Sequence, residues 1–467
     1  MSHHFDPTVL REYDIRGIIG ETLGPDDARA IGRTFGSMLR EAGGRKVAVG
    51  YDGRVSSPML EHALVEGLSA SGVDVVRVGM GPTPMLYFAA ASRGDVDGGI
   101  QITGSHNPAN YNGFKMVFQG RPFFGPDIQE LGRRAAEGAW RDGVGTVEDA
   151  DVMPAYLDKL LSGLDGIDRA RLADLKVGWD AGNGAAGPAL ELLTARLPGE
   201  HRLLYTEVDG DFPNHHPDPT VEANLLDLKR LVAEESLDFG VAFDGDGDRI
   251  GAIDGEGRVI WGDQLLMIYA QDLLQRMPGA TIIADVKASR ALFDSVARNG
   301  GEPLMWKTGH SLIKSKMKET GSPLAGEMSG HVFFADTYYG YDDALYAGVR
   351  LIAAAARLGK SVTQLRGEMP RMLNTPELRF QVDETRKFAA IDEVKARLAN
   401  SDAQVDGTDG VRVTNADGWW LLRASNTQDV LVARAESDTP EGLDRLMEQI
   451  DEQLALSGLE RGEQAAH

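Results

Sequence analysis

Residues 46–54 read KVAVGYDGR, and two other stretches repeat this local form. Residues 175–187 read LKVGWDAGNGAAG, and residues 281–290 read TIIADVKASR. Each stretch is a short apolar run that ends in an aspartate and passes through small or polar residues into a helical pattern. Short apolar strands that alternate with helices are typical of parallel α/β units. The wide spacing of the repeats predicts three related α/β domains, with ligand sites at the carboxyl ends of their strands.

The length of the chain and its turn-rich stretches indicate how many domains it has and where they begin and end. A chain of 467 residues, at about 150 residues per domain, indicates three or four domains. Candidate boundaries lie at Met153-Pro154, in Asp254–Gly257 and in a proline-containing stretch over residues 367–376. Beyond that stretch, mixed strands and helices predict an α+β domain. We therefore expect four domains, over residues 1–153, 154–255, 256–368 and 369–467.

Composition and charge narrow the class of protein. The formal net charge of −23 argues against nucleic acid or an anionic membrane as a general partner. The sequence has no run of about 18 apolar residues, and its N-terminus lacks a secretory pattern. The absence of cysteine excludes disulfides and fits a reducing compartment. We expect a cytoplasmic protein whose partners are small molecules.

The acidic loop at residues 244–249 reads DGDGDR. Residues at i, i+2 and i+4 share one face of an extended segment, so the carboxylates of Asp244, Asp246 and Asp248 can converge on one cation. Apolar runs on both sides make a solvated acidic turn a poor alternative. An EF-hand loop is excluded because its sixth position would be arginine rather than glycine, and its twelfth glycine rather than glutamate. The loop therefore predicts a Mg²⁺ site with room for a phosphate oxygen.

Three polar loops add groups that suit phosphoryl transfer. Residues 103–109 read TGSHNPA, where Ser105 is either a phosphate carrier or part of a simple turn. Residues 423–427 read RASNT, which suits a phosphate dianion or a polar hairpin. Residues 326–331 read GEMSGH, whose carboxylate, hydroxyl and imidazole could recognise sugar hydroxyls. A serine, a carboxylate-bound cation and arginines are the groups that phosphoryl transfer requires.

A glycine-rich stretch offers a competing interpretation. Residues 182–187 match G-x-G-x-x-G after a strand, which is a dinucleotide fingerprint. However, Asp180 places a carboxylate where pyrophosphate would lie, and the rest of the chain suggests no hydride chemistry. We interpret these glycines as positions of close packing, and the pair His215-His216 as part of a structural loop.

Taken in order, these motifs resemble the α-D-phosphohexomutase superfamily, and within it the bacterial phosphomannomutase/phosphoglucomutase group. The resemblance runs almost end to end. It is carried by EYDIRG at 12–17, TGSHNP at 103–108, NGFK at 112–115, FPNHHPDP at 212–219, DGDGDR at 244–249, DVK at 285–287, WKTGH at 306–310, GEMSGH at 326–331 and RASNT at 423–427. It implies four domains around a central cleft, which in order carry the phosphoserine, the metal, the sugar-recognition loop and the phosphate-binding loop.

The resemblance implies reversible conversion of hexose 1-phosphates to hexose 6-phosphates, for mannose and glucose. Phosphoryl transfer would pass through a phosphoserine and a 1,6-bisphosphate that reorients in the cleft. Mg²⁺ would be the cofactor, with glucose 1,6-bisphosphate or mannose 1,6-bisphosphate as activator, and a monomer is expected. Phosphoglucosamine mutase is the nearest alternative, although its sugar loop usually has glutamine where this chain has Met328. A metal-dependent phosphatase and a non-catalytic sugar-phosphate binder are the alternatives from other classes.

The resemblance also assigns residues. Ser105, Lys115, Arg16 and His331 would act in catalysis, with the general base open between Lys115 and His331. Ser105 and the three aspartates of the acidic loop would bind Mg²⁺. The residues expected to bind substrate are Tyr13, Arg249, Lys287, Gly309, His310, Glu327, Ser329, Arg423, Ser425, Asn426 and Thr427.

Overall fold

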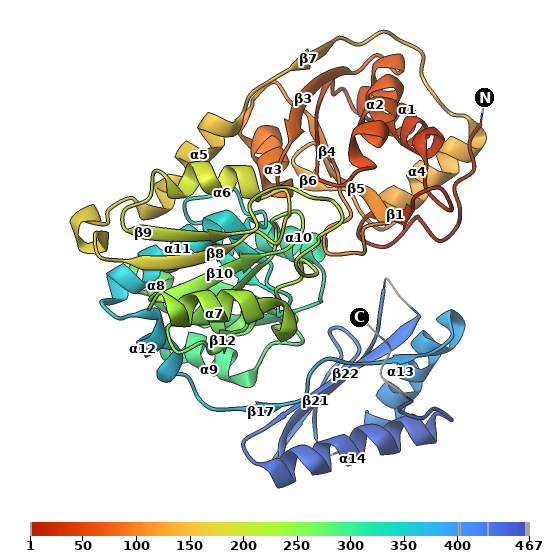
Figure 1. Ribbon diagram of the computed structural model, residues 1–467. Coiled ribbons are helices and arrows are strands. Elements are labelled where there is room, and N and C mark those ends of the chain that lie inside the picture. Colours follow the sequence, from red (N-terminus) through yellow and green to blue (C-terminus); the bar gives the residue numbers. More distant parts are fainter. Residues whose placement is uncertain (1, 400, 402, 427–428, 463–467) are drawn as a thin grey trace.

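The computed structural model describes residues 2–399, 401, 403–426 and 429–462 (Figure 1). Over these residues the chain forms four β-sheets, each with its own helices. The first three sheets mix parallel and antiparallel pairs, whereas the fourth is antiparallel throughout. The predicted fold class, three related α/β domains followed by an α+β domain, is confirmed.

The N-terminal sheet has the strand order β1-β5-β4-β2-β3-β7, with β6 paired to β5. Its strands are β1 (Ile15–Ile18), β2 (Lys46–Tyr51), β3 (Asp74–Met80), β4 (Gly98–Ile102), β5 (Tyr111–Phe118), β6 (Arg121–Pro122) and β7 (Val147–Asp149). Its helices are α1 (Pro25–Glu41), α2 (Ser57–Ala70), α3 (Thr83–Ser92) and α4 (Pro126–Glu137). Because β2 and β4 are parallel neighbours, the loops that follow them lie together at one edge of the sheet. Those loops carry Asp52 and Ser105.

The second sheet has the order β12-β11-β10-β8-β9. Its strands are β8 (Lys176–Asp180), β9 (Glu200–Leu204), β10 (Phe239–Phe243), β11 (Ile250–Asp254) and β12 (Val259–Ile260). The accompanying helices are α5 (Met153–Leu161), α6 (Gly187–Thr194) and α7 (Leu226–Glu234), with short 3-10 turns η1 (Ser162–Leu164), η2 (Arg169–Leu172) and η3 (Glu222–Leu225). Strands β10 and β11 are antiparallel and buried, so the acidic loop is the turn between two core strands.

The third sheet has the order β14-β13-β15-β16. Its strands are β13 (Thr281–Asp285), β14 (Glu302–Trp306), β15 (Leu324–Gly326) and β16 (Val332–Phe334). Its helices are α8 (Gly262–Arg276), α9 (Arg290–Arg298), α10 (His310–Thr320), α11 (Ala344–Leu358) and α12 (Val362–Gly367). The GEMSGH segment extends from the end of β15 to the residue before β16, which places it at the carboxyl edge of β15.

The fourth sheet has the order β17-β22-β21-β20-β19, with β18 also paired to β22. Its strands are β17 (Leu373–Asn374), β18 (Leu378–Gln381), β19 (Gln404–Asp406), β20 (Val411–Asn415), β21 (Gly418–Ala424) and β22 (Val430–Ser437), with helices α13 (Glu384–Leu398) and α14 (Pro440–Leu456). The sequence pattern predicts the start of α13 at Ala389. The helix starts earlier because the Asp383 side chain accepts from the backbone N of Thr385 and caps it.

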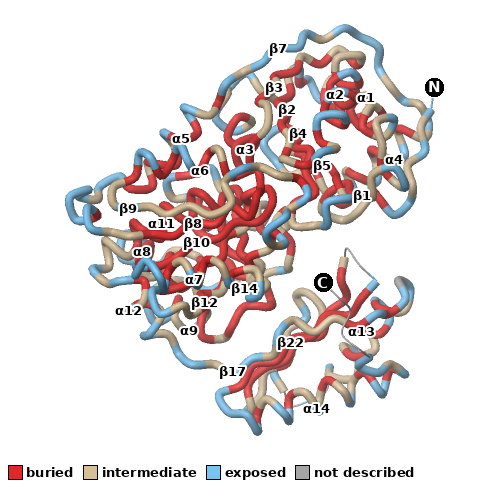
Figure 2. Tube along the Cα trace, in the orientation of Figure 1, coloured by how far each residue is buried: buried red, intermediate tan, exposed pale blue. Residues whose placement is uncertain are grey.

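The first three domains share a hydrophobic core, whereas the fourth domain has a core of its own. One continuous buried cluster contains Phe88 of the first domain, Trp179 of the second and Leu345 of the third. The main core of the fourth domain contains only its own residues, as the separate buried sheet in Figure 2 shows. A small cluster of Val286 with Trp419 and Leu421 joins it to the third domain. In the part of the chain that the structure describes, no helix is long and apolar enough to span a bilayer.

Candidate active site

Ser105 follows β4, and its hydroxyl reaches across to the second domain. Ser105 Oγ donates to Asp244 Oδ2 at 2.9 Å and lies 3.2 Å from His106 Nδ1. The serine is buried and has a φ of +49°, in the left-handed region that costs energy for a residue other than glycine. Its neighbours must therefore hold this loop in place.

Arg54 supplies that support from the loop after β2. Its guanidinium carries five N–H donors in a rigid fork, and all of them are used. Nε donates to Asp52 Oδ2 at 3.2 Å, and the same carboxylate oxygen accepts from the backbone N of Gly104 at 3.0 Å. The other four donors bind, at 2.5–2.9 Å, the backbone carbonyl oxygens of Ser105, Asn107, Pro108 and Tyr111. The sequence marked Asp52 only as the end of a strand, and the role of Arg54 was missed.

The acidic loop presents one oxygen of each carboxylate to a common point. Asp244 Oδ1 accepts from the backbone N of Asp248 and of Arg249, both at 3.1 Å, which leaves Oδ2 facing Ser105. Among the described residues, Asp246 Oδ1 and Asp248 Oδ1 are buried and accept no hydrogen bond. Ligand atoms from the three carboxylates lie within 4.8 Å of one another. These buried oxygens fit a small, hard cation such as Mg²⁺, which would satisfy them.

Lys115, on β5, joins the first domain to the acidic loop. Its ammonium donates to Asp246 Oδ2 at 2.8 Å and to Asp248 Oδ2 at 2.5 Å, and Thr83 Oγ1 donates to the same Asp246 oxygen at 2.5 Å. Burial disfavours a charged ammonium, yet the carboxylates of Asp246 and Asp248 raise the pKa of Lys115 above its usual value. Burial, together with the two neighbouring carboxylates, raises the pKa of Asp244 well above its usual value. In this arrangement Lys115 is a charged donor.

His331 lies on the other side of the acidic loop. Its Nε2 accepts from Arg249 Nε at 3.1 Å, and because a guanidinium only donates, Nε2 carries the lone pair and Nδ1 the proton. Nδ1 lies 3.0 Å from Asp342 Oδ2 and 3.6 Å from Asp248 Oδ1. Lys314 donates to the other oxygen of Asp342 at 2.9 Å. Neither Nδ1 nor Asp342 Oδ2 makes a hydrogen bond among the described residues, so Asp342 is a close buried carboxylate beside the His331 ring, and the sequence did not suggest it.

Two other predicted residues border this group. Arg16 Nη1 donates to the backbone O of Gly104 at 3.3 Å, and Nη2 pairs with Asp14, so Arg16 lies beside the serine loop. The His310 ring stacks on His331 with centroids 5.5 Å apart. Burial and, after it, the Lys314 ammonium hold the pKa of His310 well below its usual value. His310 is therefore a neutral imidazole next to His331.

A second group brings the first, third and fourth domains together. Tyr13 donates its hydroxyl to the backbone O of Thr308 at 2.9 Å and accepts from Asn426 Nδ2 at 2.7 Å. The backbone N of Gly309 donates to Glu327 Oε1 at 2.7 Å. Gly309 has a φ of +133°, and a Cβ there would lie 2.7 Å from the Tyr13 ring, so the position requires glycine.

Two predicted cations are paired with carboxylates that the sequence did not single out. Arg423 Nε donates to Asp409 Oδ2 at 3.0 Å, and the backbone N of Thr308 donates to the same oxygen at 3.0 Å. Lys287 donates to Glu377 Oε2 at 2.9 Å. The Lys287–Glu377 pair and the Thr308–Asp409 hydrogen bond link the third and fourth domains, whereas Arg423 and Asp409 both belong to the fourth. The positive groups Arg423 and Lys287 are therefore bound by acidic partners.

The remaining predicted residues are less closely joined to these groups. Ser425 is buried after β21 and donates its backbone N to Val430 O at 3.0 Å. Ser329 is half-buried in the turn before β16, and its side chain makes no hydrogen bond within the described part of the chain. Thr427 lies outside the described residues.

The glycine-rich stretch serves close packing. The backbone N of Ala185 donates to Gly245 O at 2.9 Å, and a Cβ on Gly184 would lie 2.8 Å from that oxygen. The Asp180 carboxylate accepts from the backbone N of Gly182 at 2.9 Å and lies 3.1 Å from His215 Nε2. These glycines therefore let one loop of the second domain approach the acidic loop.

A buried serine, a carboxylate triplet suited to a cation and an arginine loop on a separate domain define a phosphoryl-transfer enzyme. Family models match the chain in four consecutive parts. They are described as phosphoglucomutase/phosphomannomutase alpha/beta/alpha domain I (residues 7–142), domain II (154–257), domain III (261–372) and the C-terminal domain (377–453). The chain belongs to the phosphoglucomutase/phosphomannomutase family. It is a phosphohexomutase, an enzyme that interconverts hexose 1- and 6-phosphates.

Individual relatives agree with this assignment. The chain is 45% identical to a phosphomannomutase/phosphoglucomutase of Pseudomonas aeruginosa, over 94% of each protein. It matches the crystal structure of a phosphoglucomutase/phosphomannomutase family protein from Burkholderia thailandensis with a TM-score of 0.91 and 45% identity, over 97% of this chain and 98% of that one. An N-acetylphosphoglucosamine mutase of Aspergillus fumigatus, solved with GlcNAc-6P and magnesium, has a TM-score of 0.59 and 14% identity over 96% of each chain. That distant match shows the fold alone.

Proposed function

We propose that this phosphohexomutase acts on glucose and mannose phosphates, with Ser105 as its phosphate carrier. The observation that carries the proposal is the 2.9 Å hydrogen bond from Ser105 Oγ to Asp244, within a buried carboxylate triplet. The Pseudomonas aeruginosa relative is named for both sugars, which supports the choice of substrates.

Asp244, Asp246 and Asp248, together with a phosphorylated Ser105, would hold Mg²⁺. When bound there, the cation would stabilise negative charge on the transferring phosphoryl group. The two buried carboxylate oxygens without hydrogen bonds support this assignment. The magnesium in the complex of the distant Aspergillus fumigatus relative agrees with it.

The reaction would begin with phosphorylated Ser105. The free hydroxyl of the hexose 1-phosphate attacks the phosphorus atom, the Ser105 Oγ–P bond breaks and a new P–O bond forms. The hydroxyl proton passes to a base, the departing Ser105 Oγ takes up a proton, and the product is a hexose 1,6-bisphosphate. After this intermediate has turned over, its other phosphoryl group returns to Ser105 and leaves the hexose 6-phosphate. Glucose 1,6-bisphosphate or mannose 1,6-bisphosphate would phosphorylate an enzyme that has lost its phosphate.

We assign the base to His331 rather than Lys115. The ammonium of Lys115 is held in its charged form by two carboxylates and has no lone pair to accept a proton. His331 Nε2 has a lone pair, which accepts from Arg249 Nε here and would have to be released to act as a base, and Nδ1 lies 3.0 Å from Asp342 Oδ2. This arrangement is suited to a general base that lies beside a carboxylate. Lys115 and Arg16 would instead balance charge beside Ser105.

The distal phosphate of the substrate would bind the fourth domain. Arg423, Ser425 and Asn426, with Thr427 by sequence, would donate to its oxygens, because a phosphate dianion accepts several hydrogen bonds at once. Glu327 and Ser329 would recognise sugar hydroxyls from the third domain, and Tyr13, Gly309 and His310 would border the ring. Arg249 and Lys287 would add positive charge. Closure of the fourth domain would exclude water, which otherwise could hydrolyse the phosphoserine.

Parallel assays of glucose 1-phosphate, mannose 1-phosphate and glucosamine 1-phosphate test this proposal, with Mg²⁺, trace glucose 1,6-bisphosphate and a free-phosphate readout. We expect comparable turnover of the first two sugars, slower turnover of the third and no net phosphate release. A preference for glucosamine phosphate would identify the alternative mutase. Phosphate release equal to substrate consumption would identify a phosphatase, and either result would contradict the proposal.

A further inference from the structure

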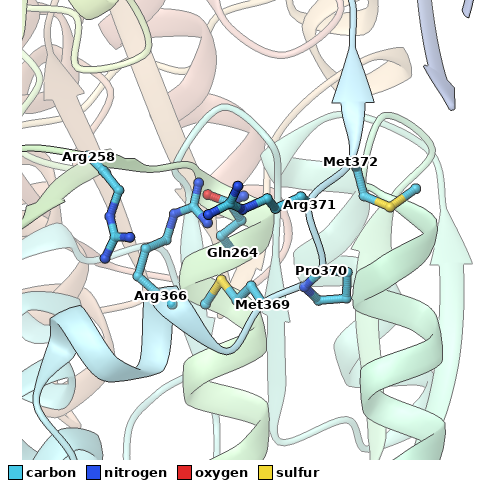
Figure 3. Close-up of a pocket in the computed structure, with 8 residues that line it drawn as sticks. Arg258, Gln264, Arg366, Met369, Pro370, Arg371 and Met372 are labelled. Atoms are coloured by element: carbon cyan, nitrogen blue, oxygen red, sulfur yellow. The ribbon is translucent and has the colours of Figure 1, made fainter. Parts of the chain in front are cut away.

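A cavity of about 240 Å³ lies outside the proposed active site, where the third domain passes into the segment that leads to the fourth. We call it the hinge cavity. Figure 3 shows most of the residues that line it. The lining residues are Arg258, Gln264, Arg366, Gly367, Met369, Pro370, Arg371 and Met372. None of them is assigned to the mutase reaction.

The charge of the hinge cavity is unusual for this chain. Three arginines line it, although the net charge of the protein is −23. Arg258 is neutralised by Asp254 at 2.6 Å and Glu256 at 3.1 Å. Among the described residues, no carboxylate lies within ion-pair distance of Arg366 or Arg371. Arg366 and Arg371 therefore line the cavity without forming an ion pair in the part of the chain that the structure describes.

The arrangement of these two groups suits an anion. Arg366 uses Nε to donate to the backbone O of Val259 at 3.2 Å, which leaves the end of its guanidinium directed to the cavity. In Figure 3 the guanidinium groups of Arg366 and Arg371 both point toward Gln264. Burial lowers the pKa of Arg366, the positive charge of Arg258 and Arg371 lowers it further, and the carboxylates of Asp254 and Asp263 partly oppose this shift. Two guanidinium groups close together repel each other, and a bound anion would remove that repulsion.

The size and walls of the cavity limit the choice of anion. Met369, Pro370 and Met372 also line the cavity and add apolar surface to it. Guanidinium forks match phosphate oxygens in geometry, and an apolar wall can contact the carbon skeleton of an ester. We propose that the hinge cavity is a second anion site, which binds a small phosphate-bearing molecule through Arg366 and Arg371.

Binding there would act on the junction between domains. Arg366 belongs to α12 of the third domain, whereas Arg371 lies in the segment that enters β17 of the fourth sheet. An anion held by both would tie this segment to the third domain. The site would thereby restrict movement of the fourth domain without touching the residues that react.

Isothermal titration calorimetry of the full chain tests the site, with inorganic phosphate and glucose 6-phosphate as separate probes. The variants are Arg371→Gln, which changes one exposed side chain, and Arg366→Gln/Arg371→Gln. The matched control, Arg169→Gln/Arg171→Gln, removes two exposed arginines from η2. We expect wild type and control to show a class of sites whose affinity falls about tenfold or more in both test variants, because each variant removes charged hydrogen bonds to the anion.

The two probes identify the source of the phosphate. If inorganic phosphate binds to wild type and more weakly to the arginine variants, the hinge cavity is a site for free phosphate. If only glucose 6-phosphate shows this dependence on the arginines, the cavity binds a phosphate ester. Crystals soaked with tungstate, a phosphate analogue, should show the heavy atom between Arg366 and Arg371. Identical titrations in wild type and both test variants, or tungstate only at the Arg423 loop, would overturn the proposal. Mutase turnover is measured separately in each variant, so loss of this site is distinguishable from loss of the proposed function.

Discussion

At the scale of single residues, the reactive serine depends on a buried arginine that makes no contact with substrate in our account. Arg54 holds four backbone carbonyl oxygens of the serine loop. Ser105 keeps its left-handed backbone because those contacts offset the cost of that conformation. Arg54 is therefore a positioning residue.

Arg54→Lys should preserve the positive charge but remove the planar guanidinium group and its five N–H donors. Several buried carbonyl oxygens would lose their partners, so we expect the free energy of unfolding to fall by roughly 2–4 kcal/mol. We also expect kcat to fall while KM changes little, because the serine is misplaced but the binding loops are intact. Urea denaturation and steady-state kinetics measure both effects. If Arg54→Lys had the same free energy of unfolding and the same kcat as wild type, this role for Arg54 would be contradicted.

Asp342→Asn tests the carboxylate beside His331. An amide carries no negative charge, so the carboxylate beside the Nδ1–H group of His331 and its electrostatic support for an imidazolium would be lost. We expect kcat to fall about 10- to 100-fold with thermal stability close to wild type. Asp211→Asn, at an exposed carboxylate, should leave kcat unchanged. Equal kcat in wild type and Asp342→Asn would mean that His331 does not need this carboxylate.

At the scale of elements, the acidic loop between β10 and β11 should couple metal binding to pH. The pKa of Asp244 is raised well above its usual value by burial and then by the carboxylates of Asp246 and Asp248. The folded site therefore retains protons to higher pH than a free aspartate, and Mg²⁺ must displace them. We expect Mg²⁺ affinity to fall as pH is lowered and protons to be released on binding.

Calorimetry in buffers of different ionisation enthalpy, at about pH 6 and about pH 8, measures both quantities. Asp248→Asn should weaken Mg²⁺ binding at both values, whereas Asp211→Asn should not. An affinity that is the same at both values, with no proton release, would show that the three carboxylates are already fully ionised without the metal.

Local patterns were enough to predict much at this scale. The apolar run predicted before the acidic loop is strand β10, because a short apolar run before a polar turn is a strong signal. Strand Gln404–Asp406 was not predicted, since it is short and polar and pairs only at one edge. The partners of the site residues were also missed. Asp342 and Asp409 meet His331 and Arg423 only after folding, and nothing in their local sequence marks those contacts.

At the scale of the whole molecule, Tyr13 links three domains. Its hydroxyl donates to Thr308 of the third domain and accepts from Asn426 of the fourth. Burial raises the pKa of Tyr13 to about 12, so the hydroxyl keeps its proton at any working pH. The link therefore favours an arrangement in which the fourth domain lies against the first.

Tyr13→Phe keeps the ring that packs on Gly309 but removes both hydrogen bonds. Each contributes roughly 0.5–1.5 kcal/mol, so we expect KM for hexose 1-phosphate to rise about three- to tenfold with a smaller change in kcat. Small-angle scattering should show a larger mean radius in the variant. Tyr339→Phe, at an exposed tyrosine, is the control. An unchanged KM would show that this contact does not contribute to closure.

A single-turnover labelling experiment tests whether Ser105 carries the phosphoryl group. Enzyme is mixed with ³²P-labelled glucose 1,6-bisphosphate, quenched, digested and analysed by mass spectrometry, with Ser105→Ala in parallel. We predict label on Ser105 in wild type, transfer of that label to added glucose 1-phosphate, and neither label nor turnover in Ser105→Ala. Turnover in Ser105→Ala, or label on another residue that is passed to the sugar, would contradict this prediction.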